Sequence, residues 1–437
     1  MTDCRQGILD FPSFDARKIE ASFEGGDVSS DGGVMLLRQA DRRLGLCRAL
    51  DRAIEDPRDA AMISHRQLDL LRQRIYGIAL GYEDLNDHDS LRTDPLWQSA
   101  VERADELASS PTLCRLEGRA DRRTAWAMSR VLVEGFIDSQ PLPPEELVLD
   151  FDATDDRVHG AQEGRFFHGY YGDWCFLPLY VFCGERLLVS YLRPSNIDGA
   201  RHAWAVLKLL VDRLRRAWPG VRIIFRGDSG FCRWKMLRWC ERHGVDYVVG
   251  VAKNPRLLGL AEGLMGRAEE QHRATGAKAR VFGWLEYAAD SWDRPRRVIA
   301  KAEHGAMGAN PRFVVSTLHG DAGEIYDHVY CARGEMENRI KEQQLGLFAD
   351  RTSCHAWWAN QFRLLLSSAA YVLLEAIRRL GLRDTELARA QVCTIRLKLL
   401  KLGTVILRNT RRIRLLFSSA YPNRDLFGLV ARRLETG

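Results

Sequence analysis

Three aspartates follow apolar, strand-like segments that lie far apart in this sequence. Residues 147–154 read Leu-Val-Leu-Asp-Phe-Asp-Ala-Thr, and residues 221–229 read Val-Arg-Ile-Ile-Phe-Arg-Gly-Asp-Ser. Alternation along the first segment predicts Asp150 and Asp152 on one face, with Asp152 nearer the end of the strand, and Asp228 ends the second segment. Because a buried carboxylate without a partner destabilises a fold, these acids indicate a functional site.

Two carboxylates brought close together repel each other, and a divalent cation relieves that repulsion. Oxygen ligands of this kind suit Mg²⁺ or Mn²⁺, and a pair of ions roughly 4 Å apart can serve phosphoryl transfer. Either aspartate string taken alone has a plainer interpretation: Asp150 could be a capping or hydrogen-bonded acid, and Asp228 could open an Asp-Ser-Gly turn. Their matching positions favour a metal site, with the choice between Asp150 and Asp152 left open.

A third acid, Glu337, lies in a segment with helical spacing. If residues 330–344 are helical, one stripe carries Tyr330, Arg333, Glu337, Lys341 and Gln344. Such a stripe can offer an acid to a metal and cations to neighbouring phosphates. The alternative is a charged surface helix with Glu/Lys pairs.

The elements that must position these acids follow from periodicity. Residues 147–154, 174–182, 186–192, 221–228 and 247–252 predict five strands, and residues 199–217 and 233–243 predict two helices. Three strands followed by helix, strand, helix and strand is the element order of a ribonuclease-H-like α/β fold with a mixed sheet. Further strand-like runs at 280–287, 297–302 and 312–317 predict a β-strand insertion before Glu337. Trp284 and Trp292 of this insertion could stack on a flipped base, although packing is the commoner role of such residues.

The boundaries predicted from these changes of pattern define five parts. They are a mainly helical N-terminal domain at 1–140, the first part of the core at 147–252, the β-rich insertion at 253–320, the second part of the core at 321–380, and a basic C-terminal segment at 381–437. Proline-rich residues 141–146 form the linker after the N-terminal domain.

Within the N-terminal part, apolar periodicity at 68–80 breaks at Gly81 and resumes beyond Asp89. Two helices across such a turn could form a helix-turn-helix DNA reader, with Arg66, Arg72, Arg74 and Arg92 nearby to meet phosphates. The plainer alternative is a helical hairpin whose arginines are solvated.

The C-terminal part carries an independent electrostatic signal. No acid occurs between Glu386 and Asp425, whereas cations recur throughout that stretch. Residues 395–399 alternate apolar and basic side chains, which predicts a strand with one basic face. A face of this kind would neutralise DNA phosphates. The cations predicted to contact DNA in this segment are Arg396, Lys398, Lys401, Arg411 and Arg412.

Composition is that of an ordinary globular protein. The 437 residues are 46% hydrophobic and 28% charged, with a net charge of +6, which is compatible with nucleic-acid binding. The first residues lack a secretory pattern and no apolar run is long enough to cross a membrane, so a cytoplasmic protein is expected. The ten cysteines are scattered singly, which supports neither a zinc site nor a disulfide framework.

Three motifs carry a resemblance to a known family. Asp152-Ala-Thr154, Arg226-Gly-Asp228 and Tyr330-x-x-Arg333-x-x-x-Glu337 resemble the catalytic motifs of DDE transposases from bacterial insertion sequences, in the branch called transposase DDE domain group 1. Further stretches similar to that group lie at 29–33, 79–88, 110–113, 168–172 and 415–422. One position departs from the pattern: the lysine expected seven residues after the glutamate is Gln344, and Lys341 is the nearest substitute.

The resemblance implies a ribonuclease-H-like core whose metal triad is Asp152, Asp228 and Glu337, with Tyr330 and Arg333 serving DNA strands near the cut. The expected cofactor is Mg²⁺ or Mn²⁺, with two ions per active site. The expected partners are double-stranded DNA, as terminal inverted repeats and as target, and a second copy of the chain in a synaptic homodimer. Two alternatives remain: an inactive or domesticated DNA-binding relative, and a ribonuclease-H-like nuclease without strand transfer.

Overall fold

The computed structural model describes residues 8–435, and the chain forms two compact units. Unit 1 contains residues 1–51, 56–116 and 376–437, and unit 2 contains residues 52–55 and 117–375. The opening residues 1–6, on which the expectation of no secretory signal rests, lie outside the described residues.

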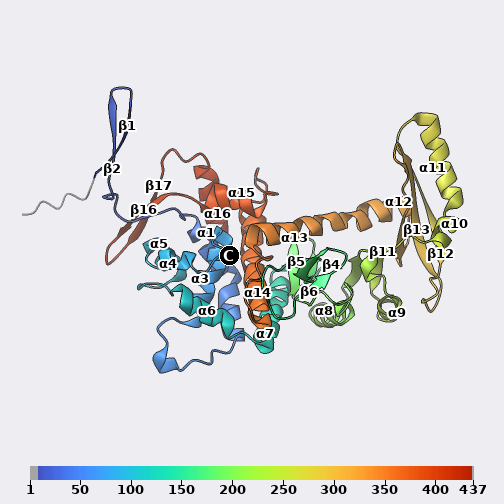
Figure 1. The fold of residues 1–437 in the computed structure, drawn as a ribbon, viewed down its shortest axis with the longest axis horizontal. Helices are drawn as coiled ribbons and strands as arrows, with labels where there is room; N and C mark the ends of the chain where they lie inside the picture. Colours follow the sequence, from blue (N-terminus) through green and yellow to red (C-terminus); the bar gives the residue numbers. More distant parts are fainter. Residues whose placement is uncertain (1–7, 436–437) are drawn as a thin grey trace, which may run out of the picture. The chain divides into compact units, whose positions relative to one another are not determined.

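Unit 2 is built on one mixed β-sheet (Figure 1). Its core strands lie in the order β9-β8-β4-β10-β11. β4, β10 and β11 are parallel, whereas β8 and β9 run antiparallel to their neighbours. The bounds are Glu146–Ala153 for β4, Leu179–Cys183 for β8, Arg186–Tyr191 for β9, Arg222–Gly227 for β10 and Asp246–Val251 for β11. This order and these directions confirm the predicted ribonuclease-H-like fold.

Helices cover both faces of this sheet. One face packs on α7 (Arg122–Asp138), α8 (Ala203–Ala217) and α9 (Trp234–Arg242) through a continuous apolar core that includes Leu149 and Phe151. On the other face, α14 (Trp357–Ala376) lies against β8 and β9, where the Phe182 and Tyr371 rings are 5.8 Å apart. The near-continuous apolar runs of the parallel strands follow from this burial on both faces.

The three strands expected in the insertion are present, and they extend the core sheet. They are β12 (Ala279–Tyr287), β13 (Arg296–Gly305) and β15 (Arg312–Ser316). β15 pairs antiparallel with β11, so the sheet continues as β11-β15-β13-β12. Pairing covers the open edge of β11, which explains why the strands join the core sheet. The segment predicted as β-rich also holds helices α10 (Pro255–Leu260) and α11 (Glu262–Thr275), and α11 packs along β12 and β13 (Figure 1).

The glutamate lies on a long helical run that begins beyond β15. The run starts with α12 (Ala322–Glu324), passes through a π-helical turn at Ile325–Tyr330 and a 3₁₀ turn at Cys331–Arg333, and continues as α13 (Gly334–Leu347). Ile325 and Tyr326 belong to an apolar cluster with Ile224 and Val248 of the sheet. The run therefore packs on the face of the sheet opposite α8 and α9.

Unit 1 contains the helices expected at its N-terminal end, and two of the four arginines expected beside them are buried, whereas the Arg66 side chain is 64% exposed and that of Arg92 is 35% exposed. Arg72 of α3 (Gln67–Leu80) is 1% exposed and donates to Glu102 at 2.7 Å and to Asp41 at 3.3 Å. Arg74 is also 1% exposed. At Arg72 and Arg74 the DNA-reading and the solvated alternatives are both wrong, because these guanidinium groups are buried among acids and carbonyls. A DNA contact of Arg66 and Arg92 stays a prediction.

The strand predicted at 395–399 is also wrong. These residues belong to α15 (Val392–Ile395) and to a π-helical turn at Arg396–Leu400. Arg396 donates to the carbonyls of Ala79 at 2.9 Å and Ile78 at 3.3 Å, at the end of α3. These carbonyls lie in the last turn of α3, where a helix runs out of its own amide donors and the Gly81 amide already donates to Ile78, so this tertiary contact outweighs the alternating pattern. The strands of this region are β16 (Thr404–Arg408) and β17 (Ile413–Phe417), which form a sheet with β3 (Val28–Ser29).

Two general features concern residues 8–435 as described. No helix among them is long and apolar enough to span a membrane. Every cysteine in this range is free, and three of them, Cys47, Cys175 and Cys240, are buried.

Candidate active site

Asp152 and Asp228 lie side by side because of the register between two parallel strands. Phe151 of β4 is paired with Gly227 of β10, so the two aspartates occupy equivalent positions at adjacent strand ends. The Asp228 carboxylate accepts a hydrogen bond from the Gly230 amide at 2.9 Å, which holds the turn that follows β10. The turn predicted as the plainer role of Asp228 is therefore present, and it leaves the carboxylate at the end of the sheet beside Asp152.

Asp150 has a different environment from Asp152. It is 2% exposed and receives two hydrogen bonds from the Arg226 guanidinium, one of them 2.7 Å long. Arg226 also donates to the carbonyl of Val329, just before Tyr330. Burial raises the pKa of Asp150, and Arg226 opposes that rise. Asp150 is thus neutralised by an arginine that joins β4 and β10 to the glutamate helix, and Asp152 is the acid directed to the site.

Arg333 forms ion pairs with both Glu337 and Asp152. The Arg333 Nη2 atom lies 2.5 Å from Glu337 Oε1, and its Nη1 atom lies 3.6 Å from Asp152 Oδ1. The Asp152 side chain is 16% exposed and the Glu337 side chain 42% exposed. Two acids of the predicted triad, Asp152 and Glu337, are therefore joined by one guanidinium, with Glu337 the more exposed of the two.

The charges of the three acids affect the pKa of Asp152. Burial raises the pKa of Asp152 to about 7, Arg333 opposes the rise, and the charges of Asp228 and Glu337 add to it. A carboxylate in this setting needs a positive neighbour to remain ionised at neutral pH.

The donor chemistry of the triad fits a divalent cation, because all the available ligand atoms are carboxylate oxygens. Within the described part of the chain, no group of three acidic, histidine or cysteine side chains is arranged to hold a metal. In this conformation the Arg333 guanidinium contacts Asp152 and Glu337 where an ion would otherwise neutralise them. Asp152, Asp228 and Glu337 are the residues that would hold the ions.

Tyr330 packs against the turn of Asp228. A Cβ atom built on Gly250 of β11 would lie 2.7 Å from the Tyr330 hydroxyl and 2.9 Å from the Ser229 amide nitrogen. Burial raises the pKa of Tyr330, Arg333 opposes this, and Asp228 adds to it. Gly250 is thus a site residue that sequence reasoning missed, because only a tertiary contact requires a residue without a side chain there.

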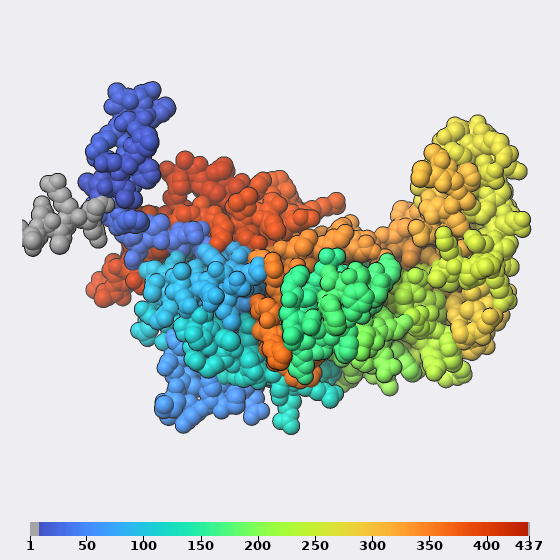
Figure 2. Space-filling model, in the orientation of Figure 1, coloured from blue at the N-terminus to red at the C-terminus, as the bar shows by residue number. Residues whose placement is uncertain are grey.

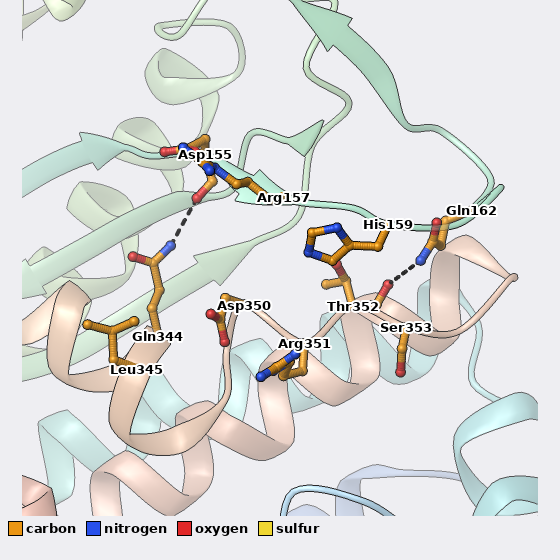
Figure 3. A pocket seen from close by; sticks show the side chains of 10 residues that line it. All are labelled: Asp155, Arg157, His159, Gln162, Gln344, Leu345, Asp350, Arg351, Thr352 and Ser353. Carbon is orange, nitrogen blue, oxygen red and sulfur yellow. Dashed lines mark hydrogen bonds and ion pairs between the residues drawn. The ribbon is translucent and has the colours of Figure 1, made fainter. Parts of the chain in front are cut away.

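Lys341 and Gln344 continue the same helix stripe in different ways. Lys341 is exposed. Gln344 donates to the carbonyl of Asp155 at 3.0 Å and so ties the helix to the segment after Asp152 (Figure 3). It lines a pocket of about 430 Å³, shown in Figure 3, whose walls are Asp155, Arg157, His159, Gln162, Gln344, Leu345, Asp350, Arg351, Thr352 and Ser353.

The cations predicted to contact DNA in the C-terminal segment divide into two groups. Lys398, Arg411 and Arg412 are exposed. Arg396 caps α3, and Lys401 donates to Asp31 at 2.9 Å and lies 3.8 Å from the centre of the Tyr82 ring. Arg396 and Lys401 thus have internal roles in unit 1, and a contact of the exposed three with DNA stays a prediction.

The two tryptophans of the insertion are packed against their own strands. Arg297 lies 3.9 Å from the centre of the Trp284 ring, whose indole nitrogen donates to the carbonyl of Gly320 at 3.1 Å. Trp292 packs on Tyr287 and on Arg296.

The chain matches the family transposase DDE domain group 1 over residues 11–436. No curated protein matches it. Among solved structures, it is similar to the piggyBac transposase in a synaptic complex with hairpin DNA, with a TM-score of 0.44 and 10% identity over 85% of this chain and 80% of that one. The family match extends over nearly the whole chain, and the chain therefore belongs to the transposase DDE domain group 1 family.

Proposed function

We propose that this transposase cuts DNA at the terminal inverted repeats of a bacterial insertion sequence and joins the freed ends to target DNA. The observation that supports this most directly is that Asp228 lies beside Asp152 at the ends of β10 and β4, while Arg333 joins Asp152 to Glu337. Three acids whose charges act on one another favour a bound cation, and this supports a metal-dependent reaction.

Two divalent ions, Mg²⁺ or Mn²⁺, would supply activation of the attacking oxygen and stabilisation of the leaving oxygen. The role of Asp152, Asp228 and Glu337 in this proposal is to hold them. Asp228 is positioned by the Gly230 amide, and Asp152 by the pairing of β4 with β10. The chemistry is hydrolysis of a phosphodiester at the end of the element, followed by attack of the liberated 3′-hydroxyl on the target strand.

Arg333 has two roles in this proposal, as a partner of the acids and as a ligand of a DNA phosphate. In the metal-free protein it neutralises Asp152 and Glu337. With the acids engaged by cations, its guanidinium is free to bind a phosphate oxygen, for which its planar fork is well suited. Tyr330 is fixed against Gly250 of β11, at the ends of the β-strands that carry the aspartates. In this proposal it contacts the DNA strand near the cut.

Double-stranded DNA is the proposed partner, and two copies of the chain would hold the two ends of the element. The exposed cations Lys398, Arg411 and Arg412 would add phosphate contacts. Binding should therefore weaken as salt concentration rises.

The test uses linear DNA that carries the short inverted repeats flanking the coding frame. We expect cleavage that requires Mg²⁺ and that is lost, by at least about a thousandfold, in Asp152→Asn, Asp228→Asn and Glu337→Gln. Glu335→Gln is the matched control, because Glu335 is an exposed acid in the first turn of the same helix.

The outcomes separate the candidate functions. Cleavage with joined products supports transposition, and cleavage without joined products indicates a nuclease. Binding of the ends without any cleavage indicates a DNA-binding derivative. An unchanged rate in Asp228→Asn would refute the assignment of the site.

A further inference from the structure

Two acids beside the pocket of Figure 3 do not belong to the predicted triad. Asp156 begins β5 (Asp156–Arg157), a short strand on the stretch of chain that follows Asp152, and Asp350 lies in the segment that follows α13. Figure 2 shows this part of unit 2, in green, next to the orange chain of α13 and the segment after it. The two acids therefore come from the stretches of chain that follow Asp152 and Glu337.

Several polar atoms near Asp156 are buried without a partner. Asp156 is 1% exposed, and neither of its carboxylate oxygens has a hydrogen-bond partner among the described residues. The same is true of the hydroxyl groups of Tyr180, which is fully buried, and of Thr352, which is 4% exposed. Buried polar groups are ordinarily hydrogen-bonded, and buried charges are paired or bind a metal. Four oxygen atoms in this state indicate a bound ligand.

These oxygen atoms belong to one cluster. Burial raises the pKa of Asp156 well above its ordinary value, the nearby Thr352 hydroxyl opposes the rise, and the Asp350 charge adds to it. Burial also raises the pKa of Tyr180, and the charges of Asp156 and Asp350 add to that rise. Asp350 and Thr352 line the pocket, so they connect the buried groups to solvent (Figure 3).

The cations around the pocket leave Asp156 without a counterion. Arg157 lies 3.5 Å from Asp155 and 3.7 Å from Asp173. Arg351 opposes a rise in the pKa of Asp350 that burial causes. No ion pair of Asp156 occurs within residues 8–435, so its carboxyl group must either carry a proton or meet a cation from solution.

The donor atoms of the cluster suit a hard divalent cation. They belong to two carboxyl groups and two hydroxyl groups, and oxygen is the ligand atom that Ca²⁺ and Mg²⁺ prefer. One divalent ion balances two carboxylate charges and would also give the unpartnered oxygens a partner. Water in the pocket would complete the coordination, because both ions accept water molecules beside protein ligands.

We propose that this cluster binds one divalent cation of the Ca²⁺ or Mg²⁺ class, at a site separate from the triad, with ligands from Asp156, Asp350, Tyr180 and Thr352. In the ion-free protein, a proton on Asp156 keeps that carboxyl group neutral. The site does not depend on the proposed function, because none of its ligands belongs to the triad.

The ion would join the chain after Asp152 to the chain after the glutamate helix. Two hydrogen bonds already link these segments: Gln344 donates to the Asp155 carbonyl at 3.0 Å, and Gln162 donates to the Thr352 carbonyl at 3.2 Å. An ion bound only by the folded state adds to its stability. Its role is therefore to hold the two segments together, and it takes no part in the chemical step.

The experiment measures Ca²⁺ binding by the full-length chain without DNA. All samples carry Asp152→Asn and Asp228→Asn, so that the triad retains a single acid. Equilibrium dialysis with radioactive calcium should detect one bound ion per chain at about 1 mM free Ca²⁺. Asp156→Asn, added to this background, should weaken binding at least about tenfold, because it removes a charged ligand of nearly unchanged shape.

Two further variants separate the site from general effects. Tyr180→Phe removes only a hydroxyl group, and should weaken Ca²⁺ binding about threefold while keeping the melting temperature in EDTA, since that hydroxyl has no partner. Asp173→Asn is the matched control: Asp173 is an acid on β7 (Asp173–Phe176), the strand that pairs with β5, and its replacement should leave Ca²⁺ binding unchanged.

Thermal unfolding gives a second measurement. Ca²⁺ at about ten times its dissociation constant should raise the melting temperature of the background protein by about 2 °C and that of the Asp156→Asn protein by less than about 0.5 °C.

Equal Ca²⁺ affinity of the background and of either the Asp156→Asn or the Tyr180→Phe protein would overturn the inference. Absence of a bound ion in the background protein at about 10 mM Ca²⁺ would also overturn it, and would show that a proton alone neutralises Asp156. Since the triad aspartates are replaced in every sample, failure of the cleavage reaction in the proposed function would not change these results.

Discussion

Arg333 and Glu337 form an ion pair one helical turn apart, with Nη2 and Oε1 separated by 2.5 Å. The same guanidinium lies 3.6 Å from Asp152. Two of the three predicted metal ligands are thus paired with a cation that the chain itself supplies.

The first prediction concerns this arginine. Arg333→Gln should lower the free energy of unfolding of the metal-free protein by about 1 kcal/mol, a modest value because Glu337 is partly exposed. Mg²⁺ should stabilise the variant more than the unmodified protein, because the acids then lack their internal counterion. Urea unfolding with and without Mg²⁺ measures both effects. An equal gain from Mg²⁺ in the two proteins would contradict the idea that Arg333 competes with the ion.

The second prediction concerns Gly250. Gly250→Ala should lower the free energy of unfolding by about 1–3 kcal/mol and reduce cleavage, because the added methyl group would clash with Tyr330 and with the turn of Asp228. Gly266→Ala on α11 is the control: an added Cβ meets no atom within 4 Å there, and the change should stabilise the helix by about 0.5–1 kcal/mol. Thermal unfolding and cleavage rates of the two variants and the unmodified protein measure these effects. Full activity in Gly250→Ala would show that Tyr330 need not be held in this position.

The third prediction concerns the buried pair of Arg226 and Asp150. Arg226→Met should cost about 3–5 kcal/mol in the free energy of unfolding, since it leaves the Asp150 charge buried and unpaired. The double variant Arg226→Met with Asp150→Leu should recover most of that loss. Unfolding of the two single variants and the double variant in guanidinium chloride gives the coupling free energy between Arg226 and Asp150. Additive losses would indicate that the pair does not join β4 to β10 as the structure shows.

The fourth prediction concerns pH. Burial raises the pKa of Asp156 well above its ordinary value, and the Thr352 hydroxyl opposes the rise. The folded state then keeps a proton that the unfolded state loses above about pH 4, so stability should fall as the pH rises beyond that value.

Asp156→Asn cannot titrate, so its free energy of unfolding should match that of the unmodified protein near pH 4 and exceed it at pH 8. Melting temperatures across this range measure the difference. Asp173→Asn, a neighbouring acid on β7 with a 39% exposed side chain, is the control and should give parallel pH profiles. A constant gap between Asp156→Asn and the unmodified protein would mean that Asp156 does not carry the pH dependence.

The core strands were predictable because each is a short apolar run bounded by turn residues, and local periodicity is readable without tertiary information. The same reasoning failed at 395–399, where Arg396 binds the carbonyls that end α3. A contact between residues more than three hundred positions apart cannot be seen in a five-residue pattern. It failed again at Arg72, whose burial depends on Asp41 and Glu102.

The amino-acid pattern alone was enough to place Asp150, Asp152 and Asp228 on predicted strands and Glu337 on a predicted helix, because strand ends and helix stripes are local properties. Which of the two acids on β4 faces the site depended on the fold, since Arg226 neutralises Asp150 only when β4 and β10 pair in register. The need for glycine at position 250 and the contact of Arg333 with two acids likewise arise from packing between distant segments. Such contacts depend on distances in space, which spacing along a chain does not encode.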